Sequence, residues 1–237
     1  MPDPTVGLEV GGTKLYTVEG QMPFFWTSGF AVDADGAPRA YHPGGRAAGA
    51  LDATANAGHP GNWWGIVTDG NGDPVIQGDG DPAPGFYVST TALVDGTRPR
   101  ADPNRYVDAS TVPYVSLPSP AIKHFGVTKG DLAMVLNGKN GQFSSAIVAD
   151  VGPATQIGEG SVALATALGL SGDASHGGTS SGIVWVVFPG SAASPAWPRA
   201  LDEIASSASA LLGAFGGVAP LLTSLPQFQA VFAALTF

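Results

Sequence analysis

The chain has 237 residues, of which 44% are hydrophobic, so it is long and apolar enough for a buried core. Its 34 glycines and 20 prolines favour short strands joined by turns and argue against an all-helical protein, and the lack of cysteine excludes disulfides, thiolate zinc sites and cysteine nucleophiles. The 19 acidic against 10 basic residues give a formal charge of -9, which repels nucleic acid, favours a cationic ligand and also serves solubility.

The N-terminal segment, residues 1–23, carries few packing signals, and we expect an edge strand or an ordered arm there. It lacks the basic stretch followed by an apolar stretch that marks a signal peptide. No run of 18 uninterrupted apolar residues occurs along the chain, so no transmembrane segment is predicted.

An apolar run over residues 24–41 leads into a strand in which alternation places Asp33 and Asp35 on the same side. Two acids on one face are costly to bury, which indicates a solvent-filled cleft beside them. Residues 63–77 predict a β-hairpin around the glycine-rich turn at 70–73.

The second half of the chain has clearer periodicity. Two β runs, residues 132–136 and 143–149, flank a glycine-containing turn, and Asp150 closes the second run. A short helix is expected over residues 161–168, with its first serine as N-cap and Gly169 just past its end.

The last part of the chain is strongly apolar. Residues 182–188 predict a buried strand, and residues 198–212 predict a helix with one apolar face. From Ile204 to Phe237 there is no charged residue, so we expect the tail, residues 199–237, to pack on the core or to support self-association. No composition shift divides the chain, which predicts a single catalytic domain over residues 1–237 with its body at 24–198.

Patterns that suggest a metal site are incomplete. Residues 69–73 resemble the start of a calcium loop, but Pro74 stands where such a loop needs glycine and Gly80 where it needs glutamate. The four histidines lack the spacing of a metal site. We therefore expect neither a metal nor a cofactor.

The segment that carries chemistry contains two short motifs. Ala149-Asp150-Val151-Gly152-Pro153 ends a strand, and Ile157-Gly158-Glu159-Gly160-Ser161 precedes the short helix. This order resembles the double-psi β-barrel of expansins, family 45 endoglucanases and bacterial lytic transglycosylases, in which a D-x-G-P strand end presents an aspartate to the sugar cleft.

From Phe24 to Pro198 the chain is similar to glycoside hydrolase family 75, the chitosanases known from fungi and actinobacteria. The matching pieces are Asp33–Pro38 with Tyr41, Trp63–Asp69, Tyr87–Thr91, Arg105–Asp108, Val112–Val115, Ala149–Asp150 and Gly158–Ser161. The resemblance implies a mainly β fold: a six-stranded double-psi β-barrel core with added strands and hairpins, a few short helices and a C-terminal helical segment.

The resemblance also implies that Asp150 and Glu159 are the essential pair of an inverting hydrolase. One protonated carboxyl donates to the leaving oxygen and an ionised one activates water, which requires a gap of roughly 6.5 to 9.5 Å between them. Asp150 resembles the proton donor, which leaves Glu159 as the base. The opposite assignment stays open, as does a role for Asp33 or Asp35 as base. We expect the helix N-terminus to lower the pKa of Glu159.

Substrate contacts follow from residue chemistry. Acidic side chains are expected to bind glucosamine ammonium groups, and aromatic rings to stack on sugar faces. Adjacent residues on a strand point opposite ways, so at most one of Trp63 and Trp64 faces the sugar. The residues expected to bind substrate are Asp33, Asp35 and Asp69 among the acids, and Tyr41, Trp63 and Tyr106 among the aromatic residues.

The function that these features favour is endo-acting hydrolysis of chitosan by a secreted enzyme, without nucleic acid as a partner. Two alternatives remain at this point. One is lytic cleavage of peptidoglycan on the same barrel, and the other is non-catalytic carbohydrate binding, as in expansins.

Overall fold

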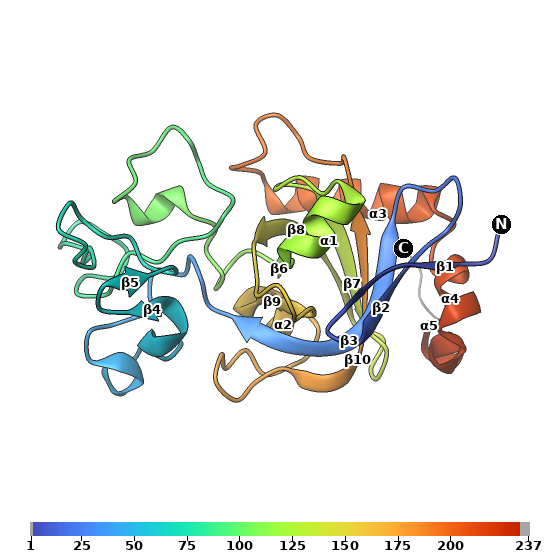
Figure 1. Ribbon diagram of the computed structural model, residues 1–237, viewed down its shortest axis with the longest axis horizontal. Helices are drawn as coiled ribbons and strands as arrows, with labels where there is room; N and C mark the ends of the chain where they lie inside the picture. The colour runs from blue at the N-terminus through green and yellow to red at the C-terminus, as the bar shows by residue number, and fades with distance from the viewer. Residues whose placement is uncertain (1, 233–237) are drawn as a thin grey trace.

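A closed barrel of six strands forms the centre of the protein. The computed structural model describes residues 2–232. Neighbouring strands pair in the order β3, β10, β7, β8, β6 and β9, and β9 then pairs with β3 to close the ring (Figure 1). Their bounds are β3 Phe24–Asp33, β6 Tyr114–Ser116, β7 Leu132–Asn137, β8 Phe143–Asp150, β9 Glu159–Ser161 and β10 Thr179–Phe188. The predicted mainly β fold with a six-stranded barrel is confirmed.

The direction of the strands explains where the long connections lie. β3 and β9 are parallel, as are β6 and β8, whereas the other four neighbouring pairs of the ring are antiparallel. β7 and β8 follow each other in sequence and form the predicted hairpin. The longest connection, residues 34–113 between β3 and β6, leaves the barrel and builds a separate lobe.

The barrel strands are apolar because both of their faces are covered. Along β10, Val184 and Val186 belong to one buried cluster, while Ile183, Trp185 and Val187 belong to another. A strand covered on both faces has a continuous apolar run rather than an alternating one. This is why the predicted strand at residues 182–188 contains no polar position.

The expected helix after the second motif is also confirmed. α2 spans Val162–Ala167, and the Ser161 hydroxyl accepts a hydrogen bond from the backbone N–H of Leu164. Gly169 adopts a φ of +69° just past the helix, which side chains other than glycine rarely tolerate. A second helix, α1 at Ser119–Phe125, has no predicted counterpart.

The described N-terminal and C-terminal segments pack against the barrel. An N-terminal hairpin, β1 Thr5–Val10 and β2 Thr13–Thr17, extends the sheet at the edge of β3. The C-terminal segment contains α3 Leu201–Ala214, α4 Ala219–Ser224, η4 Pro226–Phe228 and α5 Gln229–Phe232.

The C-terminal segment, which is uncharged from Ile204 onward, covers one face of the barrel. Leu212, Leu221 and Leu225 are buried in the same cluster as Met134 of β7. Self-association through this segment stays a prediction, and residues 233–237 lie outside the described part of the chain. Among the described residues, none of the helices has the length and apolar character needed to cross a membrane.

The lobe lies beside one end of the barrel and consists mostly of loops (Figure 1). It contains η1 Gly45–Ala48, η2 Thr54–Ala57, β4 Gly58–His59, β5 Asn62–Trp63 and η3 Pro103–Arg105. The hairpin expected over residues 63–77 is irregular: the pairing of Thr68 with Pro74 is an isolated bridge. Regular strand pairing in the described lobe is therefore limited to β4–β5 and isolated bridges.

Candidate active site

A groove of about 960 Å³ lies between the lobe and the end of the barrel. Five acidic side chains line it, and none of its described lining residues is lysine, arginine or histidine. The barrel contributes Asp33, Ser116, Asp150 and Glu159, and the lobe contributes Asp35, Tyr41, Asp52, Asn56 and Trp64.

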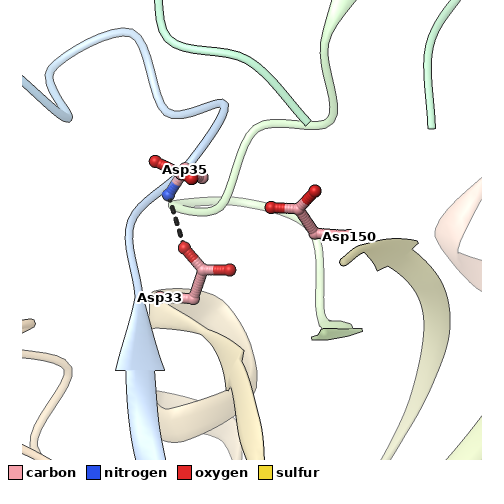
Figure 2. Close-up of side chains that lie close together, drawn as sticks. All are labelled: Asp33, Asp35 and Asp150. Atoms are coloured by element: carbon pink, nitrogen blue, oxygen red, sulfur yellow. Dashed lines mark hydrogen bonds between the residues drawn. The ribbon is translucent and has the colours of Figure 1, made fainter. Parts of the chain in front are cut away.

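Three of the acids form a tight group. Asp33 is the last residue of β3, Asp35 lies two residues later in the lobe, and Asp150 is the last residue of β8. Figure 2 shows Asp150 approaching the other two from a separate strand. Carboxylate oxygens of all three lie within 4.8 Å of one another. β3 ends at Asp33, so the two aspartates do not share a strand face as predicted; a turn closed by the Asp35 N–H brings both beside Asp150 instead.

Hydrogen bonds hold these carboxyls in place. The backbone N–H of Asp35 donates to Asp33 Oδ1 over 2.8 Å, and the Tyr41 hydroxyl donates to Asp35 Oδ1 over 2.6 Å. The backbone N–H of Ala92 donates to Asp150 Oδ1 over 2.9 Å. Each donor comes from the lobe, so the lobe orients the carboxyls that the barrel strands bring together.

The fourth carboxyl, Glu159, lies on the far side of β6 from Asp150. Ser116 of β6 is paired with Asp150 on one side and with Glu159 on the other. Adjacent strands are about 4.8 Å apart, so the backbones of the two acids are about 10 Å apart, and paired residues point to the same face of a sheet. A Cβ at Gly152 would lie 2.7 Å from Glu159 Oε2, so this glycine leaves room for the carboxyl.

Burial is the largest cause of the raised pKa values of Asp33, Asp35, Asp150 and Glu159. The pKa of Asp33 is raised from 3.8 to about 6 and that of Glu159 from 4.5 to about 7, mainly by burial, and the charge of Asp52 is a smaller cause of both shifts. Burial also raises the pKa of Asp35 and of Asp150 well above 3.8, with the charge of Asp33 as the next cause. No basic residue in the described groove lining offsets these effects, so Asp35 and Asp150 keep their protons to a higher pH than an ordinary carboxyl does.

The expectation of a lowered pKa for Glu159 was wrong. Glu159 begins β9, two residues before Ser161, the N-cap of a helix of only six residues. The field of such a helix terminus is short in range, and desolvation of the half-buried carboxyl exceeds it. A hydrogen bond with Ser116 favours the ionised form but does not offset burial.

Among the described residues, the carboxylate oxygens of Asp33, Asp35 and Asp150 are close enough together to serve as ligands for a cation in this groove. Oxygen ligands at this spacing suit hard divalent ions. Without a bound ion, retained protons keep the same oxygens together, consistent with their raised pKa values.

The two adjacent tryptophans lie in different environments. Trp64 is 58% exposed and lines the groove. Trp63, expected at a sugar face, is half-buried in the lobe, where its ring lies 6.2 Å from that of Tyr87. The structure therefore places Trp64, not Trp63, where a sugar can reach it.

Two other expected substrate contacts lie outside the groove lining, and one inside it is engaged. Tyr106 is 6% exposed and donates its hydroxyl hydrogen bond to the carbonyl of Arg100. Asp69 accepts two backbone N–H groups within its own turn. Tyr41 does line the groove, but it is buried and bonded to Asp35, so its ring is not free to stack on a sugar.

Several groove residues were missed by sequence reasoning. Asp52 and Asn56 lie in a lobe segment without a recognisable motif, and Ser116 lies in a short strand whose role depends on pairing. Tyr114, which is buried and outside the groove lining, donates a hydroxyl hydrogen bond to the backbone carbonyl of Asp35 over 2.9 Å. Trp64 was not missed in this way, because the sequence already named it with Trp63 as a pair of which at most one faces the sugar.

Comparison with known proteins gives one family. A family model described as fungal chitosanase of glycosyl hydrolase group 75 matches residues 31–211. The matched region contains all five acidic residues of the groove. No curated protein matches the chain.

Proposed function

The chain belongs to the fungal chitosanases of glycosyl hydrolase group 75, which makes it a chitosan-hydrolysing glycosidase, and we propose that it cuts β-1,4 glucosamine linkages at internal positions with inversion. The catalytic pair in this proposal is Asp150 and Glu159. Because the substrate is a polymer, the proposal includes an extracellular site of action.

The observation that carries the proposal is the position of the two acids on either side of Ser116. Their backbones lie about 10 Å apart and their side chains face the same groove. An inverting enzyme needs carboxyl groups roughly 6.5 to 9.5 Å apart, because a water molecule must fit beside the sugar. A retaining pair, at about 5 to 5.5 Å, would more naturally lie on adjacent strands.

The shape of the groove supports cutting at internal positions. A second hollow, lined by Thr90, Thr91 and Ala92, shares Asp35, Trp64, Asp150 and Val151 with the main groove. The Asp150 carboxyl lines both hollows and thus has open space on both sides. A polymer can extend in both directions from the bond that is cut.

The proton transfers follow from the environments of the two acids. Asp150 lies in the tight group with Asp33 and Asp35, where burial and nearby charge keep it protonated, so it donates to the glycosidic oxygen as the bond from C1 breaks. Glu159 accepts a proton from the water that attacks C1 on the opposite face. Turnover leaves Asp150 ionised and Glu159 protonated, and exchange with solvent restores both.

Glu159 must be ionised to act as the base. In the free groove its pKa is raised to about 7, mainly by burial. An ammonium group of a bound glucosamine favours the ionised carboxylate, so substrate binding lowers this pKa. A cationic substrate thereby favours the ionised form of Glu159 that activates water, whereas an uncharged sugar has no such effect on its pKa.

Paired variants test the catalytic roles. Asp150→Asn and Glu159→Gln are each expected to lower kcat on chitosan by roughly 100- to 10,000-fold, with the fold retained by circular dichroism. Asp69→Asn removes the same charge from a turn outside the groove and should keep near wild-type activity. Near full activity in either groove variant would refute the catalytic assignment.

The acid and the base can be told apart with a glucosaminide whose leaving group needs no proton. Asp150→Asn is expected to regain activity on such a substrate, while Glu159→Gln stays inactive. The reverse result would exchange the two roles. A 1,6-anhydro product from the wild type would indicate lytic chemistry, and binding without new reducing ends would indicate a carbohydrate-binding protein.

A further inference from the structure

We propose that Asp52, Asn56 and Trp64 form a subsite that recognises the amino group of one glucosamine unit, with Trp64 under the sugar ring and Asp52 as acceptor for the ammonium. The inference rests on the chitosanase activity proposed above and adds a determinant of its specificity. All three residues belong to the lobe wall of the groove.

Trp64 provides an aromatic surface of fixed orientation. Its side chain is 58% exposed, and it lines both the main groove and the second hollow. Its indole N–H donates to the backbone carbonyl of Asn56 over 2.9 Å, and its ring meets that of His59 edge to face. A large exposed aromatic ring that is already oriented loses little entropy when the apolar face of a pyranose packs on it.

Asp52 provides a carboxylate whose described partners are neutral. It is 5% exposed and lines the groove. Its Oδ1 accepts from the backbone N–H of Ala53 over 2.7 Å, and both of its oxygens accept from Asn56 Nδ2, over 3.0 and 2.9 Å. A buried carboxylate that is hydrogen-bonded without a cation retains the capacity to bind one.

The basic residue connected to this network is already engaged. Arg46 forms an ion pair of 2.8 Å with Asp173. It reaches Asp52 through the Ser175 hydroxyl, which lies 2.9 Å from Arg46 and 3.4 Å from Asp52 Oδ1. Ser175 comes from the barrel side of the groove, so these contacts hold Asp52 in place across the groove.

The charge of Asp52 acts on two other carboxyls of the groove, one of them the proposed base Glu159. It raises the pKa of both Asp33 and Glu159, although burial is the larger cause for each. An ammonium bound to Asp52 would therefore lie within electrostatic range of the catalytic centre. Recognition of the amine and ionisation of the base are linked in this arrangement.

Asn56 connects the two halves of the subsite. Its side-chain amide holds Asp52, while its backbone carbonyl holds the indole of Trp64. Both contacts start from η2, so this short helix sets the spacing between the ring surface and the carboxylate. An N-acetylated sugar placed on the same ring offers no cation and leaves the carboxylate desolvated, which predicts roughly 10- to 100-fold discrimination against it.

The test compares two chito-oligosaccharides, one fully deacetylated and one with a defined single N-acetyl group. In Asp52→Asn, kcat/KM on the deacetylated substrate is expected to fall roughly 10- to 100-fold, and the preference over the acetylated substrate to shrink by a similar factor. Asp79→Asn, which removes an exposed charge outside the groove lining, should keep the wild-type preference. An unchanged preference in Asp52→Asn would overturn the subsite.

A second variant keeps the inference testable if Asp52→Asn does not fold. Trp64→Ala removes a largely exposed side chain and should raise KM for both substrates about tenfold while kcat changes little. An unchanged KM would overturn the role of the ring. If the wild type does not cleave chitosan at all, the proposed function fails instead, so the two failures are distinguishable.

Discussion

Replacing Asp33 with asparagine should make the protein more stable at neutral and alkaline pH. The Asp33 side chain is 8% exposed, and burial raises its pKa from 3.8 to about 6. Asparagine has the same shape and keeps an oxygen that can accept from the backbone N–H of Asp35. The variant therefore removes a buried charge without removing the main contact.

The size of the effect follows from the shift in pKa. The folded state binds the Asp33 proton more tightly than the unfolded state does, so the free energy of unfolding falls as the pH rises from about 4 to about 6. A shift from 3.8 to about 6 corresponds to about 3 kcal/mol. Asp33→Asn does not lose this stability as the pH rises. Its free energy of unfolding should therefore exceed that of the wild type by up to about 3 kcal/mol at pH 8 and by about zero at pH 4.

Denaturant unfolding at pH 4, 6 and 8 measures this difference directly. The gap between variant and wild type should grow with pH, and Asp69→Asn, which removes an exposed charge, is the control for a change of net charge alone. A gap that stays flat, or a variant less stable than the wild type at pH 8, would refute the reasoning from burial.

Two further predictions concern the groove. Binding of a chito-oligosaccharide at about pH 6 should release protons, because its ammonium groups favour the ionised form of the groove carboxyls. Calorimetry in two buffers of different ionisation enthalpy measures the number of protons released, and proton uptake would contradict the prediction. Gly152→Ala should lower kcat at least about tenfold with little change in thermal stability. The added Cβ would lie 2.7 Å from Glu159 Oε2 and displace that carboxyl. An unchanged kcat would show that Glu159 tolerates displacement.

The sequence predicted those parts of the fold whose signals are local. The β7–β8 hairpin and helix α2 with its Ser161 cap were confirmed because turn and capping residues act within a few positions. Helix α1 was missed, and the lobe hairpin is less regular than expected. In the lobe, single bridges and contacts with the barrel replace the strand ladder that local alternation predicted.

The groove was harder to predict because its contacts are distant in sequence. Asp52 and Ser175 are 123 positions apart, and no local pattern links them. Strand alternation required Trp63 and Trp64 to face opposite ways but could not say which one faces the groove. The raised pKa of Glu159 depends on burial by several segments, whereas the helix terminus considered from the sequence is only one local contribution.

The most direct test of the paired-acid account is the anomeric form of the first product. Proton NMR during hydrolysis of a chito-oligosaccharide, before mutarotation equilibrates the product, distinguishes the two anomers of the new reducing end. Acids on either side of Ser116, with space for water between them, predict the α anomer from the β linkage. Initial release of the β anomer would contradict this account.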